Sequence, residues 1–131
     1  MPEIRYPIKM VRGVPVVTAP EEIDSTNAGR LRAALLRSAG RGHATLVADL
    51  SATEFCDTTG LYVLVRAHKR AEAEGGELRL VIPQAAVLRV FTVTGVDGVI
   101  PIYASLEEAL TPTPAVAIQP GRPNLRLTVP G

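Results

Sequence analysis

The chain has few of the features that mark secreted, membrane or metal-binding proteins. Its 131 residues include one cysteine, Cys56, so no internal disulfide can form, which fits a reducing cytosol. No apolar run reaches the roughly 18 residues of a membrane span, and the N-terminus lacks the basic start, apolar stretch and cleavage site of a signal peptide. His43 and His68 lie far apart in the sequence and, with Cys56, make a poor set of transition-metal ligands. We therefore expect a cytoplasmic protein that holds neither a metal nor a cofactor.

The charge of the chain is close to neutral. A formal net charge of +1 gives no broad positive field, so we expect neither nucleic acid nor a membrane as a direct partner. Hydrophobic residues make up 47% and charged residues 21%, which is ordinary for a globular protein. The length suits one domain followed by a tail. We place the domain at residues 1–110 and a proline-rich, flexible tail at residues 111–131. The alternative is a docked terminal strand, because Leu125, Leu127 and Val129 alternate with polar residues.

Strand patterns alternate with helix patterns along the domain. The predicted strands are Ile4–Val11, Val14–Thr18, Ala44–Leu50, Leu78–Ile82 and Val99–Tyr103, and the first two are joined by a turn at Gly13. The predicted helices are residues 20–42, Thr58–Glu74, one opened by Pro83 and closed by Gly95, and a short one with Ser105 and Glu108 as a capping box. Asp24, Ser25 and Thr26 are the candidate caps of the first helix. Because strands and helices alternate, the sequence predicts an α/β fold with a largely parallel sheet whose central strand is Ala44–Leu50.

The most informative segment is DLSATEFCDTTGLYVL, where a buried strand, a short loop and a helix start follow one another. Asp57, Thr58 and Thr59 fall at the helix start, where free amides point outward and the helix dipole is positive. A phosphate on Thr58 or Thr59 would meet those amides directly. Gly60 has no side chain, so another group can approach it closely. From these residues alone, the cluster is either a simple helix cap or a phosphorylation site.

Four segments together resemble the anti-sigma factor antagonists of the STAS family: EIDSTNAGRL, DLSATEFCDTTGL, AEAEGGELRLV and VLRVFTVTGV. The specific part of this resemblance is a D-[ST]-[ST]-G-L motif after a buried strand, combined with a later F-x-x-[ST]-G motif. The match covers about Pro2 to Leu110. The resemblance implies the STAS fold, a mixed and mostly parallel sheet of four to five strands packed with helices.

The resemblance also implies a function and a site. In this family the hydroxyl residue after the aspartate is phosphorylated by a partner kinase that is itself the anti-sigma factor, and here that residue is Thr58. Serine is the usual acceptor in the family. The implied partner-binding residues are Glu22, Asp24, Asp57, Thr59 and Gly60. The unmodified protein would bind the serine/threonine kinase and free a sigma factor, phosphorylation would switch this off, and a serine/threonine phosphatase would restore it. No catalytic residue is implied, so we expect a switch protein and not an enzyme.

Other interpretations remain beside this one. A STAS protein can be a scaffold or a subunit of a stress-signalling or lipid-transport complex that is never phosphorylated. A receiver domain would need an acidic pair after the first strand and a late lysine, and the sequence has neither. An enzyme with Asp57 or Cys56 as nucleophile would need a positioned base, whereas His43 precedes the central strand and belongs at the other end of the sheet. We expect Cys56 to be a small core residue and His68 to lie on a helix surface.

Overall fold

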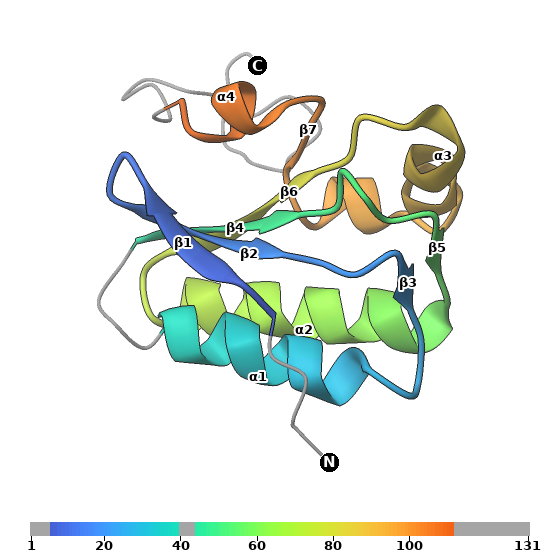
Figure 1. Cartoon of the computed structure of the whole chain (residues 1–131), viewed down its shortest axis with the longest axis horizontal. Helices are drawn as coiled ribbons and strands as arrows, with labels where there is room; N and C mark the ends of the chain where they lie inside the picture. Colours follow the sequence, from blue (N-terminus) through green and yellow to red (C-terminus); the bar gives the residue numbers. More distant parts are fainter. Residues whose placement is uncertain (1–5, 40–43, 112–131) are drawn as a thin grey trace.

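The main sheet has five strands in the order β1-β2-β4-β6-β7 (Figure 1). The structure, a computed structural model, describes residues 6–39 and 44–111. The strands are β1 (Ile8–Val11), β2 (Val14–Thr18), β4 (Thr45–Asp49), β6 (Glu77–Val81) and β7 (Ile102–Tyr103). β1 runs antiparallel to β2, and every other neighbouring pair is parallel. The predicted α/β fold with a mixed, mostly parallel sheet is confirmed, and β4 is its central strand.

Helices cover both faces of this sheet. The helices α1 (Ala28–Ala39) and α2 (Thr58–Ala73) lie side by side on one face (Figure 1). The short α4 (Leu106–Ala109) lies on the other face, where Ala109 packs with Val16, Val47 and Val81. The helix α3 (Ala85–Val93) closes the end of the larger core through Val87 and Phe91. Since β4 has a helix layer on each side, its nearly continuous apolar sequence is explained.

Two short turns confirm sequence predictions in detail. Arg12 and Gly13 connect β1 to β2, and both have positive φ angles, 52° and 79°. A two-residue hairpin turn of this kind needs left-handed backbone at both positions, which glycine adopts without strain. At the start of α4 the Glu108 amide donates to Ser105 Oγ at 3.2 Å, which is one half of the predicted capping box, while Glu108 Oε1 accepts from the Ala104 amide at 3.3 Å and not from the Ser105 amide.

The predicted start of the first helix is wrong. Residues 20–27 do not form helix: Glu22–Ile23 form a two-residue strand, β3, which pairs in parallel with β5 (Phe55–Cys56). The helix α1 begins at Ala28, whose amide donates to the carbonyl of Asp24 at 2.8 Å. Strand pairing with β5 therefore outcompetes the helical tendency of this segment, and the prediction from local sequence could not include a distant strand.

Two later boundaries also differ from the prediction. Pro83 precedes the third helix, which begins at Ala85, because Gln84 is extended (φ −86°, ψ 129°). Its side chain donates to the carbonyls of Leu50, at 2.8 Å, and Thr53, and these bonds hold the backbone outside the helix. The predicted strand from Val99 to Tyr103 is only Ile102–Tyr103, because a 3-10 helix (Val96–Gly98) and its cap at Val99 fill the preceding residues.

His68 is buried, and the prediction that it lies on a helix surface is wrong. Its side chain is 3% exposed, and Nδ1 accepts a hydrogen bond from the Leu78 amide at 3.1 Å. Nε2 lies 3.2 Å from Glu72 Oε2. The imidazole thus joins α2 to the start of β6. Both of its nitrogens have polar partners, which offset the loss of water.

A buried arginine holds the C-terminal end of the described residues. Arg79 on β6 is 4% exposed, and its Nη1 donates to the carbonyls of Ala109 at 2.8 Å and Thr111 at 2.7 Å. Thr111 is therefore attached to the sheet through the side chain of Arg79. The predictions made for Ile4, His43 and the rest of the tail lie outside the described residues.

Candidate functional site

The small β3–β5 sheet brings the two acidic segments of the sequence motif together. Glu22 pairs with Phe55 and Ile23 pairs with Cys56. The Asp57 amide then donates to the carbonyl of Ile23 at 3.0 Å. Because the two strands are parallel, the residues that follow them, Asp24 and Asp57, leave the sheet at the same edge. The structure therefore brings the two parts of the predicted site into one corner, beside the start of α2 (Figure 1).

Asp57 is the N-cap of α2. Its backbone is extended, and its Oδ1 accepts a hydrogen bond from the Gly60 amide at 2.9 Å. Thr58 and Thr59 follow as the first helical residues, and both are exposed. The cap interpretation thus applies to Asp57, while the Thr58 hydroxyl stays accessible at the positive end of a 16-residue helix. A helix cap at Asp57 and a phosphorylation site at Thr58 are therefore compatible in this geometry.

Gly60 lies beneath this corner. A Cβ atom at Gly60 would lie 2.7 Å from Ile23 Cγ2 and 2.8 Å from Cys56 Sγ, closer than real Cβ contacts. The close approach that the sequence suggested is therefore made by side chains of β3 and β5 from the same chain. Gly60 is buried, so it contributes to the site by letting the start of α2 pack directly on the small sheet.

Asp24 is fixed in a tight turn. Its Oδ1 accepts hydrogen bonds from Thr26 Oγ1 at 2.5 Å and from the Thr26 amide at 2.9 Å. These hydrogen bonds, the side-chain one first, hold the pKa of Asp24 below its usual value, so the carboxylate is ionised at neutral pH. Asn27, which the sequence analysis missed, holds the same turn: its Oδ1 accepts from the Asp24 amide at 3.0 Å and its Nδ2 donates to the Glu22 carbonyl at 2.6 Å. An asparagine just before an apolar helical pattern was the available signal.

Cys56 is a core residue, as expected. It is buried, and desolvation, with a smaller effect from the charge of Asp57, raises the pKa of its thiol to about 12. The thiol is therefore protonated at neutral pH and is a poor nucleophile. Across the part of the chain that the structure describes, no group of three or more His, Cys, Asp and Glu residues could hold a metal ion.

Gln84 is a second residue that the sequence analysis missed. Its two hydrogen bonds join the strand end at Leu50 and the loop at Thr53 to the start of α3. The loop of Thr53 is held further by Thr53 Oγ1, which donates to the Pro20 carbonyl at 2.8 Å. A glutamine after a proline carries no distinctive sequence signal, so only the tertiary structure reveals this connection.

The model of the STAS domain family matches residues 6–109. The anti-sigma-B factor antagonist of Bacillus subtilis is 36% identical over 86 residues, which cover 66% of this chain and 78% of that protein. A protein of Thermotoga neapolitana, whose name is also that of an anti-sigma factor antagonist, is 29% identical over 106 residues, 80% of this chain and 94% of that protein.

Solved structures agree with the family assignment. The crystal structure of an anti-sigma factor antagonist from Mycobacterium paratuberculosis is similar with a TM-score of 0.73 and 32% identity, over 80% of this chain and 89% of that one. A murine solute carrier anion transporter shares the fold alone. The similarity covers 78% of this chain and 18% of the transporter chain, with 23% identity and a TM-score of 0.63. The chain belongs to the STAS domain family. No helix among the described residues is long and apolar enough to cross a membrane.

Proposed function

We propose that this protein is an anti-sigma factor antagonist that is switched off by phosphorylation at Thr58. The observation that carries the proposal is the position of Thr58. Its hydroxyl is exposed in the first turn of α2, directly after the N-cap Asp57, in a STAS domain whose relatives are named as such antagonists. The acceptor is Thr58 and not Thr59, because Thr58 follows the aspartate of the motif.

In the proposed cycle the unmodified protein binds a serine/threonine kinase that is also the anti-sigma factor, and a sigma factor is released. The contact surface includes Glu22, Asp24, Asp57 and Thr59, with Gly60 shaping it from beneath. Phosphorylation of Thr58 adds nearly two negative charges beside two aspartates, so charge repulsion and desolvation weaken the complex. A serine/threonine phosphatase restores binding. The protein acts in the cytoplasm and needs no catalytic group of its own.

The test is a phosphorylation assay with the purified anti-sigma factor kinases of the host and ATP, followed by mass spectrometry. We expect the phosphate on Thr58. The Thr58→Val variant should accept none, and the matched Thr59→Val variant should be labelled like the wild type. Phosphate confined to Thr59 or Ser51 would refute the assignment.

A charge-mimicking variant separates binding from folding. Thr58→Glu should bind the kinase at least about tenfold more weakly, yet keep the melting temperature of the wild type within a few degrees. An acidic residue in the first turn of a helix is itself stabilising by about 0.3–1 kcal/mol, so lost affinity cannot come from unfolding. Equal affinity of both forms in calorimetry would contradict the switch.

The second candidate is a STAS scaffold or a subunit of a stress-signalling or lipid-transport complex. Two observations favour it: threonine replaces the usual serine, and the same fold occurs within an anion transporter. This function predicts that no host kinase labels Thr58 and that Thr58→Glu binds its partners as the wild type does.

A further inference from the structure

Two exposed aromatic side chains lie on either side of Thr58 in the sequence. Phe55, at the start of β5, is 51% exposed, and Tyr62, one helical turn after Thr58 on α2, is 60% exposed. The guanidinium of Arg66 lies 5.3 Å from the Tyr62 ring centre and donates to its hydroxyl at 3.1 Å, which holds the ring in place. Exposed, positioned aromatic rings are the commonest anchors of protein–protein contacts.

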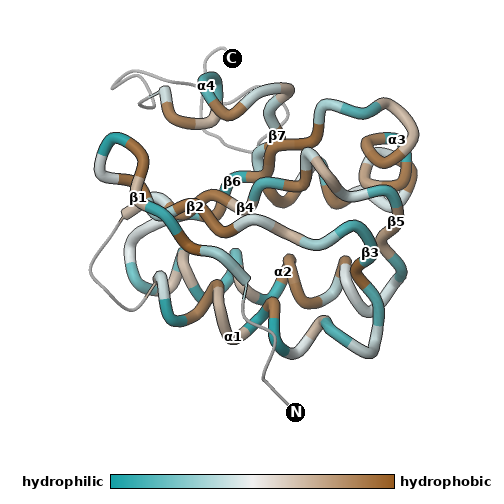
Figure 2. The backbone as a smooth tube through the Cα atoms, viewed as in Figure 1, coloured by the Kyte–Doolittle hydropathy of each residue, from teal (hydrophilic) through white to brown (hydrophobic). Residues whose placement is uncertain are grey.

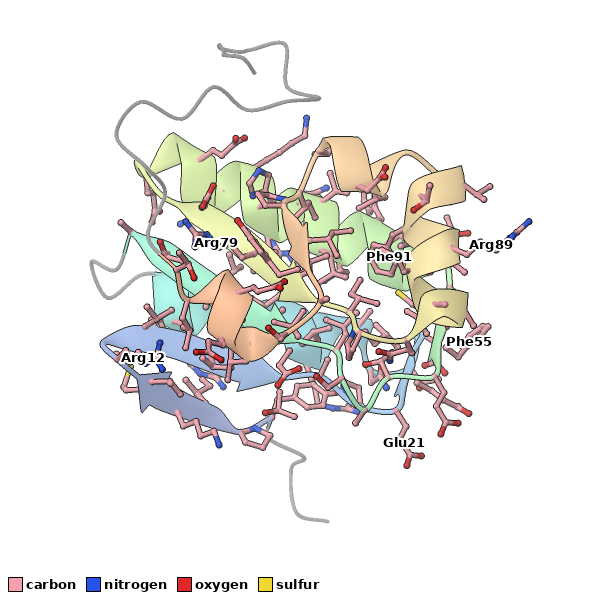
Figure 3. The ribbon with its side chains drawn as sticks, turned by 90° about the horizontal axis from the view of Figure 1, so that it is seen from above. Arg12, Glu21, Phe55, Arg79, Arg89 and Phe91 are labelled. Atoms are coloured by element: carbon pink, nitrogen blue, oxygen red, sulfur yellow. The ribbon has the colours of Figure 1, made fainter. Side chains whose placement is uncertain are left out.

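The apolar surface continues onto α3. This helix is predominantly hydrophobic (Figure 2), although only Val87 and Phe91 are fully buried. Val90 and Val93, one turn apart on its outer side, are 38% and 74% exposed. A helix that is apolar on most sides is usually covered on most sides, so the outer side of α3 lacks a partner within the described residues. Phe55 of β5 lies beside α3 (Figure 3), so the exposed apolar side of α3 adjoins this aromatic side chain.

The border of this surface is anionic. Residues 19–27 and 49–57, which run from the ends of β2 and β4 and include β3 and β5, contain no lysine or arginine. Their carboxylates are Glu21, Glu22, Asp24, Asp49, Glu54 and Asp57. Glu21 and Glu54 line a shallow hollow of about 480 Å³ together with Ala86 of α3, so the acidic segments border the start of this helix. Two exposed cations also lie on this surface: Arg89 is adjacent to Val90 on α3 and points away from Glu21 (Figure 3), and Arg66 stacks on the ring of Tyr62.

We propose that these residues form one docking surface, apolar at its centre (Phe55, Tyr62, Val90 and Val93) and acidic at its rim. Its occupant is a protein whose contact face is apolar at the centre and basic at the rim. Charge complementarity selects this occupant, since nucleic acid and anionic membranes would be repelled. A second copy in a two-fold symmetric contact would place acidic rim against acidic rim. The inference rests on the proposed function, because it names the chemistry of the surface that the kinase anti-sigma factor presents.

This arrangement explains how one phosphate can switch a surface that is already acidic. A basic partner is not repelled at long range by further negative charge. Thr58, however, directly follows Asp57 of the rim and lies one helical turn before Tyr62, so in the complex its phosphate would be desolvated where the apolar centre meets the rim, beside the charge of Asp57. The centre should therefore control the dissociation rate, and the rim should control the association rate.

The probe is the purified host anti-sigma factor that binds the wild-type chain, and the readout is association and dissociation kinetics at two salt concentrations. Val93→Ser and Tyr62→Ser should each weaken binding about tenfold or more, mainly through faster dissociation. The matched control is Met10→Ser, on β1, whose side chain is 53% exposed. Glu54→Gln should slow association severalfold at low salt and less at high salt, whereas Glu107→Gln on α4 should not. Melting curves verify that each variant is folded.

The outcomes separate the two proposals. Wild-type kinetics for Val93→Ser and Tyr62→Ser would overturn the docking surface while the Thr58 switch stands. An anti-sigma factor that binds through these residues but leaves Thr58 unlabelled would overturn the phosphorylation switch alone. Self-association that Val93→Ser abolishes would assign the surface to a second copy and overturn the inference. Tighter binding by a chain cut after Thr111 would likewise overturn it, in favour of the chain's own tail as the occupant.

Discussion

Replacing Gly60 with alanine tests whether the start of α2 packs directly on the β3–β5 sheet. The added Cβ would meet Ile23 Cγ2 at 2.7 Å and Cys56 Sγ at 2.8 Å, and both atoms belong to buried side chains that have little room to move. Overpacking of this kind costs about 1–3 kcal/mol. The helix preference of alanine over glycine returns about 0.5–1 kcal/mol. We therefore expect Gly60→Ala to lower the free energy of unfolding by up to about 2.5 kcal/mol.

The assay is urea denaturation followed by circular dichroism, with melting temperature as a second measure. For a domain of this size, 1 kcal/mol corresponds to roughly 4 °C or somewhat more. Gly29→Ala on α1 is the matched control, because a Cβ there would meet no heavy atom within 4 Å. It should stabilise the protein by about 0.5–1 kcal/mol. Equal effects of the two substitutions would refute the close packing at Gly60.

Three further predictions follow from buried groups and from the domain boundary. His68→Leu should destabilise the domain by about 1–3 kcal/mol, because it leaves the buried Leu78 amide without an acceptor, and His68→Gln should recover part of this loss in chemical denaturation. The Cys56 thiol should resist iodoacetamide at pH 8 until urea unfolds the protein, and rapid labelling of the folded protein would contradict its burial. Because folding raises the pKa of this thiol from 9.0 to about 12, its contribution to stability should persist below pH 9 and be lost as the pH rises toward 12. Removing residues 112–131 should change the melting temperature only slightly, because the hydrogen bond from Arg79 Nη1 to the Thr111 carbonyl is kept, whereas a loss of many degrees would show that the domain extends into the tail.

Several elements could be predicted because they depend on local sequence. The α2 helix begins at Thr58, as predicted, because Asp57 is a cap residue followed by helical spacing of apolar side chains. The Arg12–Gly13 hairpin and the Ser105 cap also need only nearby residues. The central strand could be recognised because a strand covered on both faces is apolar throughout.

Other features depend on contacts between distant residues, and there the predictions failed. Residues 22–23 form a strand only because Phe55 and Cys56 lie beside them. Gln84 delays α3 because the carbonyls of Leu50 and Thr53 accept its side-chain amide. His68, placed among charged residues in the sequence, is buried because its Nδ1 meets the amide of Leu78. Pairings of this kind have no local periodicity, so a single sequence does not reveal them.

The sequence alone determined the class of fold, the helix start at Thr58 and the resemblance to the STAS family, because each depends on residue patterns and their order along the chain and not on which segments pack together. The tertiary structure decided that Asp24 and Asp57 share one edge, since parallel pairing of β3 with β5 aligns two segments more than 30 residues apart in sequence. It also decided which side chains around Thr58 stay exposed. Exposure is set by what the rest of the chain covers, and that is a property of the packed domain and not of any one segment.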